Sequence, residues 1–388
     1  MSYSNSYFPS QTVSDAEKLS YDYGLKVAKA IEKEWFDDYK NNNRYMSNYN
    51  SFHNLRLYAR GEQSIQKYKD ELSINGDLSY LNLDWTPVPI ISKFVDIVVN
   101  GIAERTYDIK AFSQSPNGIE QRTEYMEKIL RDMRMQDFDE EMINEIGVDM
   151  SESNLEELPA TDEELGLHMQ LSYKQAVELA EEQALNVLFE GNNYELTKKR
   201  FYYDLTVLGI GCVKTDFNTS EGVTIKYVDP ADIVYSYTDS PYFEDIYYVG
   251  EVKDIPINEL AKEFPHLTET DLEEISKNSS YLKNNSKTRY SSEKQDNNKV
   301  QVLYFNYKTY MNEVYKVKET GSGSEKAIEK TDEFNPPENK EGNFTRLQRS
   351  IEVLYDGALV LGTKKLLKWG LSKNMMRPKS DFTKVKMN

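Results

Sequence analysis

The sequence predicts an α+β protein, with a helical N-terminal half followed by a mixed β region with short helices. Before Gly209, apolar residues recur at steps of three and four, which is the period of a helix packed on one face. After residue 222 they alternate with polar residues, which is the period of a strand. At 388 residues the chain is long enough for two or three domains.

The N-terminal stretch 1–14 is polar, and we expect it to be disordered. Ser14 and Glu17 then form a capping box, because the hydroxyl and the carboxylate can each satisfy a backbone amide of the first turn. A helix should follow over 15–38. One face of it carries apolar side chains at helical spacing: Leu25, Ala28, Ile31 and Trp35.

A second helix, over roughly 50–60, should end at Gly61, since glycine readily takes the left-handed backbone that closes a helix. The most apolar stretch lies at 86–105, where two prolines allow a helix only from Ile90 onward. Two charged residues interrupt it, so a buried helix inside a bundle is favoured over a membrane-inserting segment. Residues 106–112 ("TYDIKAF") are typical of a strand.

Residues 137–165 hold twelve acidic side chains and no basic one, so 137–168 is predicted to be a solvated acidic insertion. The spacing of a calcium-binding loop is missing there. Two helices should follow, an amphipathic one over 169–190 and another over 193–208. The glycine turn 209–211 then leads into a strand. This order is the reverse of a dinucleotide-binding fingerprint, in which the glycines follow a strand and precede a helix.

From residue 222 onward we expect three strands, in "VTIKYV", "DIVYSY" and "DIYYVGEVK". Short helices should come next, over 256–264 and 270–277. A polar, low-complexity stretch at 278–299 predicts a flexible loop.

Strands should resume over 299–310 and 312–319, and a polar excursion rich in glycine, serine, proline and asparagine interrupts them at 320–345. The last strands should form a hairpin on Asp356-Gly357. Asp-Gly between apolar runs is a strong signal for a two-residue turn.

The net charge of −18 argues against a protein that grips nucleic acid, because such affinity grows by neutralising phosphates with lysine and arginine. With 39% hydrophobic residues but 29 tyrosines, the composition suits large contacts with partner subunits. The single cysteine excludes an intrachain disulfide and a cysteine-based metal site. No signal peptide or membrane span is expected, so we expect synthesis in the cytoplasm.

The sequence holds no catalytic constellation, and we expect neither enzyme activity nor a cofactor. His53, His168 and His266 lie in separate segments without ligand spacing, so each is predicted to be a surface or packing residue. Motifs for a serine hydrolase, a P-loop or a zinc protease are missing. Cys212 follows the glycine turn and is expected to be a small buried apolar residue.

The last segment, 364–388, reverses the charge of the chain, with eight basic residues against one acidic residue. We expect it to have no closing element of structure. Lys364, Lys365 and Lys368 are its candidate contact residues, with two interpretations. They pair with acidic faces of neighbouring subunits, which is favoured, or they approach DNA phosphates and form a local positive ring.

The order of these segments resembles that of portal proteins of tailed bacteriophages, most closely those of crAss-like phages. The resemblance rests on soft patterns in sequence order rather than on invariant motifs. It runs over residues 50–362, in these stretches: "LRLYARGEQ", "WTPVPIISKFVDIVVNGIAER", "ALNVLFEGNNYELTKKRFYYDLTVLGIGCVKTDF", "VDPADIVYSYTDS", "DIYYVGEVKDIPINELAKEFP", "KVQVLYFNYKTYMNEVYKV" and "RSIEVLYDGALVLG".

The resemblance implies a portal wing with part of the clip, in a ring of twelve copies at one capsid vertex of the virion. DNA enters and leaves through such a ring. The implied partners are other copies of the chain, the major capsid protein, head–tail adaptor proteins, the terminase and double-stranded DNA, without a membrane. The resemblance would divide the chain into a helical wing region over 15–136, the acidic insertion over 137–168 and a helix pair with β wing over 169–277. The loop over 278–299, strands toward the clip over 300–363 and a basic segment over 364–388, leading to a missing stem, would follow.

Two alternatives stay open. The first is another structural phage protein, either a head–tail adaptor or a capsid-associated protein, which has no DNA channel. The second is an enzyme of an unrecognised class, which would need a well-formed polar pocket.

Overall fold

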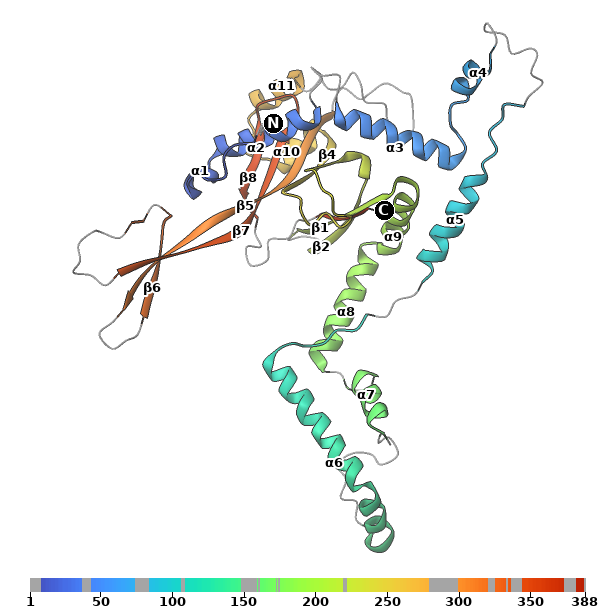
Figure 1. Cartoon of the computed structure of the whole chain (residues 1–388), viewed down its shortest axis with the longest axis vertical. Coiled ribbons are helices and arrows are strands. Elements are labelled where there is room, and N and C mark those ends of the chain that lie inside the picture. The colour runs from blue at the N-terminus through green and yellow to red at the C-terminus, as the bar shows by residue number, and fades with distance from the viewer. Residues whose placement is uncertain are drawn as a thin grey trace. The chain divides into compact units, whose positions relative to one another are not determined.

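The computed structural model divides into two compact units (Figure 1). The first unit comprises Met1–Glu104 and Leu196–Asn388, and the second comprises Arg105–Glu195. Helices dominate the N-terminal half and antiparallel sheets follow, so the α+β prediction is confirmed. The structure describes these residues: 8–36, 43–73, 84–105, 109–147, 159, 161–171, 173, 175–218, 222–278, 299–319, 325–332, 334–335, 344–372 and 382–386.

The N-terminal stretch contributes to the core, in contrast to the disorder predicted for 1–14. The Phe8 ring lies 5.5 Å from that of Tyr248 and 5.3 Å from that of Tyr247. An aromatic side chain gains enough from burial to order a short polar stretch around it. Residues 1–7 of this prediction lie outside the described residues.

The helix predicted over 15–38 is two helices, α1 (Asp15–Lys18) and α2 (Tyr21–Phe36). Ser14 caps α1 as expected, since its Oγ accepts a hydrogen bond from the Glu17 amide at 3.3 Å. Ser20 causes the break. Its Oγ donates to the Glu17 carbonyl and accepts from the Tyr23 amide, so it ends one helix and caps the next.

Helix α3 (Arg44–Arg60) ends at Gly61 as predicted, with the glycine at φ 75°. It begins earlier than expected because the Asn43 side chain accepts a hydrogen bond from the Met46 amide and caps it. Helix α4 (Gln66–Leu72) follows, and then α5 (Ile90–Ala103), which starts after Pro89 as predicted. The strand predicted over 106–112 is wrong for its described part, because residues 109–112 have irregular backbone.

The second unit is helical, with α6 (Pro116–Ile146), α7 (Asp162–Leu171) and α8 (Ala176–Gly191). The first ten residues of the predicted acidic insertion continue α6. The prediction of a single helix over 169–190 is wrong, since α7 ends at Leu171 and α8 begins at Ala176. Gln175 starts α8 in a capping box with Glu178, which explains the new helix start.

Back in the first unit, α9 (Tyr194–Leu208) ends at Gly209, whose φ of 76° turns the chain into β1 (Ile210–Asn218), as predicted. β1 pairs on one side with β2 (Gly222–Val228) and on the other with β9 (Phe382–Lys386), forming a three-stranded antiparallel sheet.

The second sheet of this unit has the order β3-β4-β5-β7-β8, with β6 attached to β5. Its strands are β3 (Ile233–Tyr235), β4 (Tyr248–Pro256), β5 (Lys299–Glu319), β6 (Glu325–Lys330), β7 (Phe344–Val360) and β8 (Leu366–Leu371). The short helices η3 (Pro230–Asp232), α10 (Ile257–Glu263) and α11 (Glu269–Asn278) lie between strands, the last two near the predicted positions. Residues 279–298 of the predicted loop lie outside the described residues.

The C-terminal part of the sheet differs from the predictions in three ways. The two strands expected over 299–319 are one strand, β5, paired with β7 along most of its length. The hairpin on Asp356-Gly357 is wrong, because both residues lie inside β7 and the turn comes at Gly362, with φ 78°. The basic segment 364–388 contains the strands β8 and β9, so the expectation that it has no closing element is wrong.

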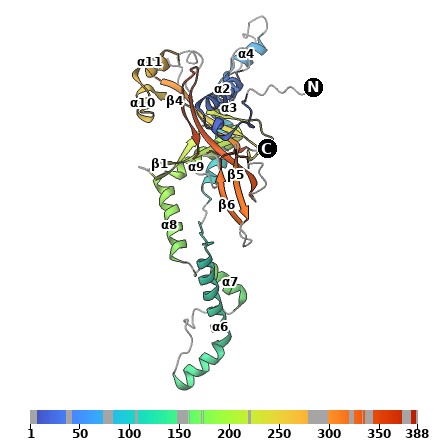
Figure 2. The same ribbon diagram turned by 90° about the vertical axis from the view of Figure 1, so that its left-hand side faces the viewer.

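The six-stranded sheet has a core on each face. On one face α2 packs through Val27, Ile31 and Trp35 against the aromatic side chains of β4, β5 and β7. On the other face α10 and α11 contribute Leu260 and Ile275 to a smaller apolar cluster. The two views of Figures 1 and 2 show α10 and α11 beside one end of this sheet.

A buried ion cluster joins α3, α9 and η3. The Arg56 guanidinium donates to Asp204 at 2.8 Å and to Asp229 at 2.9 and 3.0 Å. Tyr227 also donates its hydroxyl proton to Asp204, and Asp229 accepts from the Ala231 amide. Burial raises the pKa of Asp204, and Arg56 opposes that rise. The two carboxylates therefore depend on the guanidinium of Arg56.

Replacing Gly24 by alanine should destabilise the first unit. A Cβ at Gly24 would lie 2.4 Å from the Trp369 ring, so α2 would have to move away from β8. We expect the free energy of unfolding to fall by about 1–3 kcal/mol, as for other overpacked cores. Gly101 in α5 is the matched control, because nothing lies within 4 Å of its added Cβ. Gly101→Ala should stabilise by about 0.5–1 kcal/mol in urea unfolding, and equal effects of both changes would contradict the close contact.

Replacing Arg56 by leucine should lower the free energy of unfolding by about 3–5 kcal/mol, because two buried carboxylates lose their cation. Arg60→Leu is the control, since the Arg60 side chain is exposed and pairs with the exposed Glu62 at 3.4 Å. It should change stability by less than about 1 kcal/mol. Urea unfolding followed by tryptophan fluorescence measures both. A small effect of Arg56→Leu would show that the cluster is solvated.

Candidate functional site

The three lysines predicted to contact DNA or subunits lie around the turn from β7 to β8. Lys364 is exposed in the turn, and Lys368 is exposed on β8. Lys365 pairs with Asp271 of α11, and this contact lowers the pKa of the Asp271 carboxyl to about 2. Lys368 lies 3.6 Å from Asp356 of β7. Two of the three candidates therefore have acidic partners within their own chain.

Lys368 also lines a cleft of about 800 Å³ between the two sheets of the first unit. β1 and β2 form one wall, and β4, β5, β7 and α10 form the other. Residues of this cleft include Lys214, Lys226, Lys253, Tyr304, Asn306, Glu263 and Asp356.

Several polar side chains of this cleft form hydrogen bonds with one another. Tyr304 donates to Glu263 at 2.8 Å, and Asn306 donates to Asp356 at 2.8 Å. Lys214 and Lys253, from opposite walls, each place Nζ 5.7 Å from the Tyr304 ring centroid. Burial, and then the carboxylate of Glu263, raises the pKa of Tyr304 far above its usual value. A phenol held neutral in this way is a structural donor rather than a general base.

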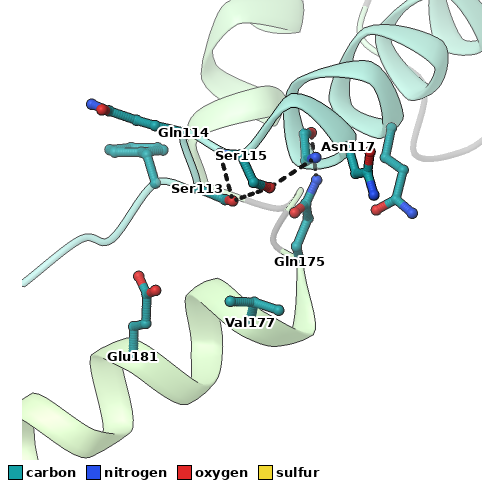
Figure 3. Close-up of a pocket in the computed structure, with 10 residues that line it drawn as sticks. Ser113, Gln114, Ser115, Asn117, Gln175, Val177 and Glu181 are labelled. Atoms are coloured by element: carbon teal, nitrogen blue, oxygen red, sulfur yellow. Dashed lines mark hydrogen bonds between the residues drawn. The ribbon is translucent and has the colours of Figure 1, made fainter. Parts of the chain in front are cut away.

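A second recess, of about 590 Å³, lies in the second unit between the starts of α6 and α8 (Figure 3). Gln175 reaches across it and donates to the Gly118 carbonyl at 2.6 Å. The Ser113 and Ser115 hydroxyls lie 3.0 Å apart, and Ser115 accepts from the Gly118 amide. These contacts cap the first turns of two helices. The polar groups of the recess therefore serve to connect the two helix starts.

Cys212 is fully buried between the sheets, as predicted, beside Lys384 of β9. Lys384 is 7% exposed, and its Nζ has no hydrogen-bond partner among the described residues. Burial lowers the pKa of Lys384 to about 8 and raises that of the Cys212 thiol to about 12. Glu251 of β4 contributes charge to the same region but pairs with Lys253 at 3.2 Å. An uncharged thiol of this kind is a poor nucleophile.

His168 and His266 pack against aromatic side chains, and His53 of α3 is half-buried. The His168 ring is stacked with Tyr125, whose hydroxyl lies 3.1 Å from Nε2, and His266 contacts Phe264 edge-on. Within the part of the chain that the structure describes, no three histidine, cysteine, aspartate or glutamate side chains are grouped to hold a metal ion.

The largest departure from the sequence prediction is the exposure of α5, which we expected to be buried in a bundle. Phe94 is 64% exposed and Ile97 is 68% exposed, and only Val95, Val99 and Ala103 are buried. Lys198 of α9 donates to the Ala103 carbonyl at 3.0 Å and holds the end of the helix. Its large apolar residues lie on one broad side of the helix, opposite Lys93, Asp96 and Asn100. The width of this side was the available signal that a single contact would not cover all of them.

Among the described residues, no helix is both long and apolar enough to cross a membrane. Helix α5 itself has 14 residues. Exposed apolar patches of this kind mark contacts with other molecules.

No model of a known protein family matches the sequence, and no curated protein matches it either.

Replacing Lys384 by methionine should raise the free energy of unfolding by about 1–3 kcal/mol at pH 7, because a buried charge without a hydrogen bond is removed. The folded-state pKa of about 8 lies below the ordinary lysine value of 10.5. The parent is therefore penalised fully below pH 8, and the penalty fades as the pH rises toward 10.5. The advantage of the variant should fade over the same range in urea unfolding.

Lys386→Met is the control on the same strand, since Lys386 is exposed. It should leave stability nearly unchanged at every pH. An advantage of Lys384→Met that does not depend on pH would show that packing, rather than charge, is responsible.

Proposed function

We propose that the chain is a portal protein of a tailed bacteriophage, a subunit of a ring of about twelve copies at one capsid vertex. Such a ring is the conduit for genome packaging and ejection and the attachment point for the tail. The main support is the order of segments over residues 50–362, which resembles portals. Its implied partners are the capsid protein, adaptors, the terminase and passing DNA.

The exposed surface of α5 supports an assembly role. Val88, Ile90, Ile91, Phe94, Ile97 and Val98 are all exposed large apolar side chains on or just before this helix. Leaving them in water forgoes roughly 25 cal/mol for each Å² that a neighbour could cover. A subunit that covers them in a ring would gain this energy on assembly.

The charge of the chain also fits a conduit. A net charge of −18 on each copy repels the phosphate backbone and disfavours tight binding of DNA.

A head–tail adaptor or a capsid-associated protein is the alternative, and exposed apolar helices would serve either of them. The size of the assembly separates the two functions. Electron microscopy of the purified chain, with mass measurement in solution, should show a closed ring with a central hole. A monomer, or an open chain of subunits, at every concentration would contradict the portal proposal.

Charged substitutions on α5 should prevent assembly without unfolding the subunit. We expect Phe94→Asp combined with Ile97→Asp to reduce the ring fraction at least about tenfold, since charges at the centre of an interface cannot be desolvated cheaply. Thermal unfolding of the monomer should stay within a few degrees of the parent, because both side chains are exposed.

The matched control is Lys93→Asp combined with Asn100→Asp, two exposed polar positions of the same helix. This variant should still form rings if the apolar side chains make the contact. Equal assembly of the Phe94/Ile97 variant and the parent would remove α5 from the interface.

A further inference from the structure

The outer ends of β5 and β7, together with β6, form a three-stranded ribbon that extends from the sheet of the first unit (Figures 1 and 2). We call residues 313–318, 325–330 and 344–349 the ribbon. All of β6 is exposed, and so are residues 345–350 of β7. The ribbon thus has two faces open to solvent over most of its length, in addition to its edges.

The register of the strands gives each face its own charge. Directly opposite residues of antiparallel strands share a face, and successive residues alternate between faces. One face, which we call the basic face, carries five basic side chains: Lys316, Lys318, Lys326, Lys330 and Arg346. The other, which we call the acidic face, carries Glu313, Glu325 and Glu329, with Arg349 as its one cation among the described side chains.

This separation works against the stability of the ribbon itself. Lys318 and Lys326 are Cα partners on neighbouring strands, and like charges directly opposite destabilise a sheet. A sheet optimised for its own stability would place opposite charges there. The arrangement instead leaves one face positive and the other negative, which is the pattern that a complementary surface would match.

The base of the ribbon is held firmly. Lys18 of α1 is fully buried and donates to the Tyr310 carbonyl at 2.6 Å, and Asp15 accepts from the Asn312 amide at 2.9 Å. Asp15 also donates its amide proton to Asp332, just after β6. Arg346 donates to Asn335 and to the Asp332 carbonyl, so it is engaged near the base. Lys318 and Lys326 lie farther out along the ribbon, and Lys330 is exposed on β6.

We propose that the ribbon joins copies of this chain, with the basic face of one copy lying against the acidic face of the next. The occupant is a second copy because the complementary surface is already present on the same element. Two sheets can stack face to face at about 10 Å, within reach of lysine and glutamate side chains. The contact is heterologous, so each copy has one basic and one acidic face to offer, and the contacts can repeat from copy to copy.

This inference rests on the proposed function only for the closing of these contacts into a ring. The association itself follows from the two charged faces. Phosphates of nucleic acid are the competing ligand for the basic face. They would leave the acidic face without a role, and the net charge of −18 opposes their approach.

The test is charge reversal on the full chain, followed by sedimentation velocity at about 50 mM and about 500 mM salt. The basic-face variant carries Lys316→Glu, Lys318→Glu and Lys326→Glu. We expect its association constant at low salt to fall at least about tenfold, because both of its faces are then acidic. The acidic-face variant carries Glu313→Lys, Glu325→Lys and Glu329→Lys. Its association constant at low salt should fall by a similar factor.

Recovery of association when the two variants are combined is the decisive measurement. Mixing the two variants, or combining all six substitutions in one chain, should recover association to within about threefold of the parent, since opposite faces meet again. A control with the same change in net charge, Lys110→Glu with Lys199→Glu and Lys262→Glu, reverses exposed lysines elsewhere and should associate like the parent. Circular dichroism confirms that each variant is folded.

The outcomes separate this inference from the proposed function. Rings that form equally well in the reversed variants overturn the ribbon contact and leave the portal proposal standing. Association that follows the charges but never yields a closed ring supports the ribbon contact and overturns the portal proposal. A parent that stays monomeric at low salt overturns both. Loss of binding to a DNA duplex of about 20 base pairs in the basic-face variant, without restoration by mixing, would assign the face to phosphates instead.

Discussion

The pairing of β5 with β7, from Val302 opposite Val360 to Lys318 opposite Phe344, is the constraint on which the first unit depends. At its inner end this pair forms the centre of the six-stranded sheet, with an apolar core on each face. At its outer end the same two strands leave the core and carry charge on both faces. One continuous hydrogen-bond ladder therefore connects the folded body to the surface that we assign to assembly, and the buried Lys18 and Asp15 fix the point of transition.

Local signals allowed much of the fold to be predicted. Gly61 and Gly209 both take left-handed backbone where helices end, and the chain turns from α9 into β1 as expected. Ser14 caps α1 because a short polar side chain reaches its own turn. Such features depend on a few neighbouring residues, so the sequence displays them directly. The same holds for α10 and α11, whose bounds agree closely with prediction.

The errors arose where distant residues decide the structure. Asp-Gly at 356–357 has the composition of a turn, but Gly357 lies under the Phe305 ring, where an added Cβ would be 2.3 Å from the ring. The glycine serves close packing across strands, and Gly362 makes the turn. The prediction that α5 is buried was wrong for a similar reason. The apolar composition of a helix does not show which other residues, if any, pack against it. Of the three candidate lysines, Lys365 pairs with Asp271 of α11, which is far away in sequence, and Lys368 pairs with Asp356 on the neighbouring strand.

Buried charges and the charges of the ribbon are arranged differently in this chain. Where a charge is buried for stability, it is matched within the subunit, as Arg56 is matched by Asp204 and Asp229. On the ribbon the charges are sorted by face, and Lys318 lies opposite Lys326 at some expense to the strand pair. An arrangement that weakens a single copy can still lower the energy of several copies, because each unfavourable face meets its complement in another subunit. The acidic balance of the whole chain adds a general repulsion between copies, which the proposed contact between oppositely charged faces would offset locally. If copies associate as proposed, the register of three strands supplies the specificity of that contact.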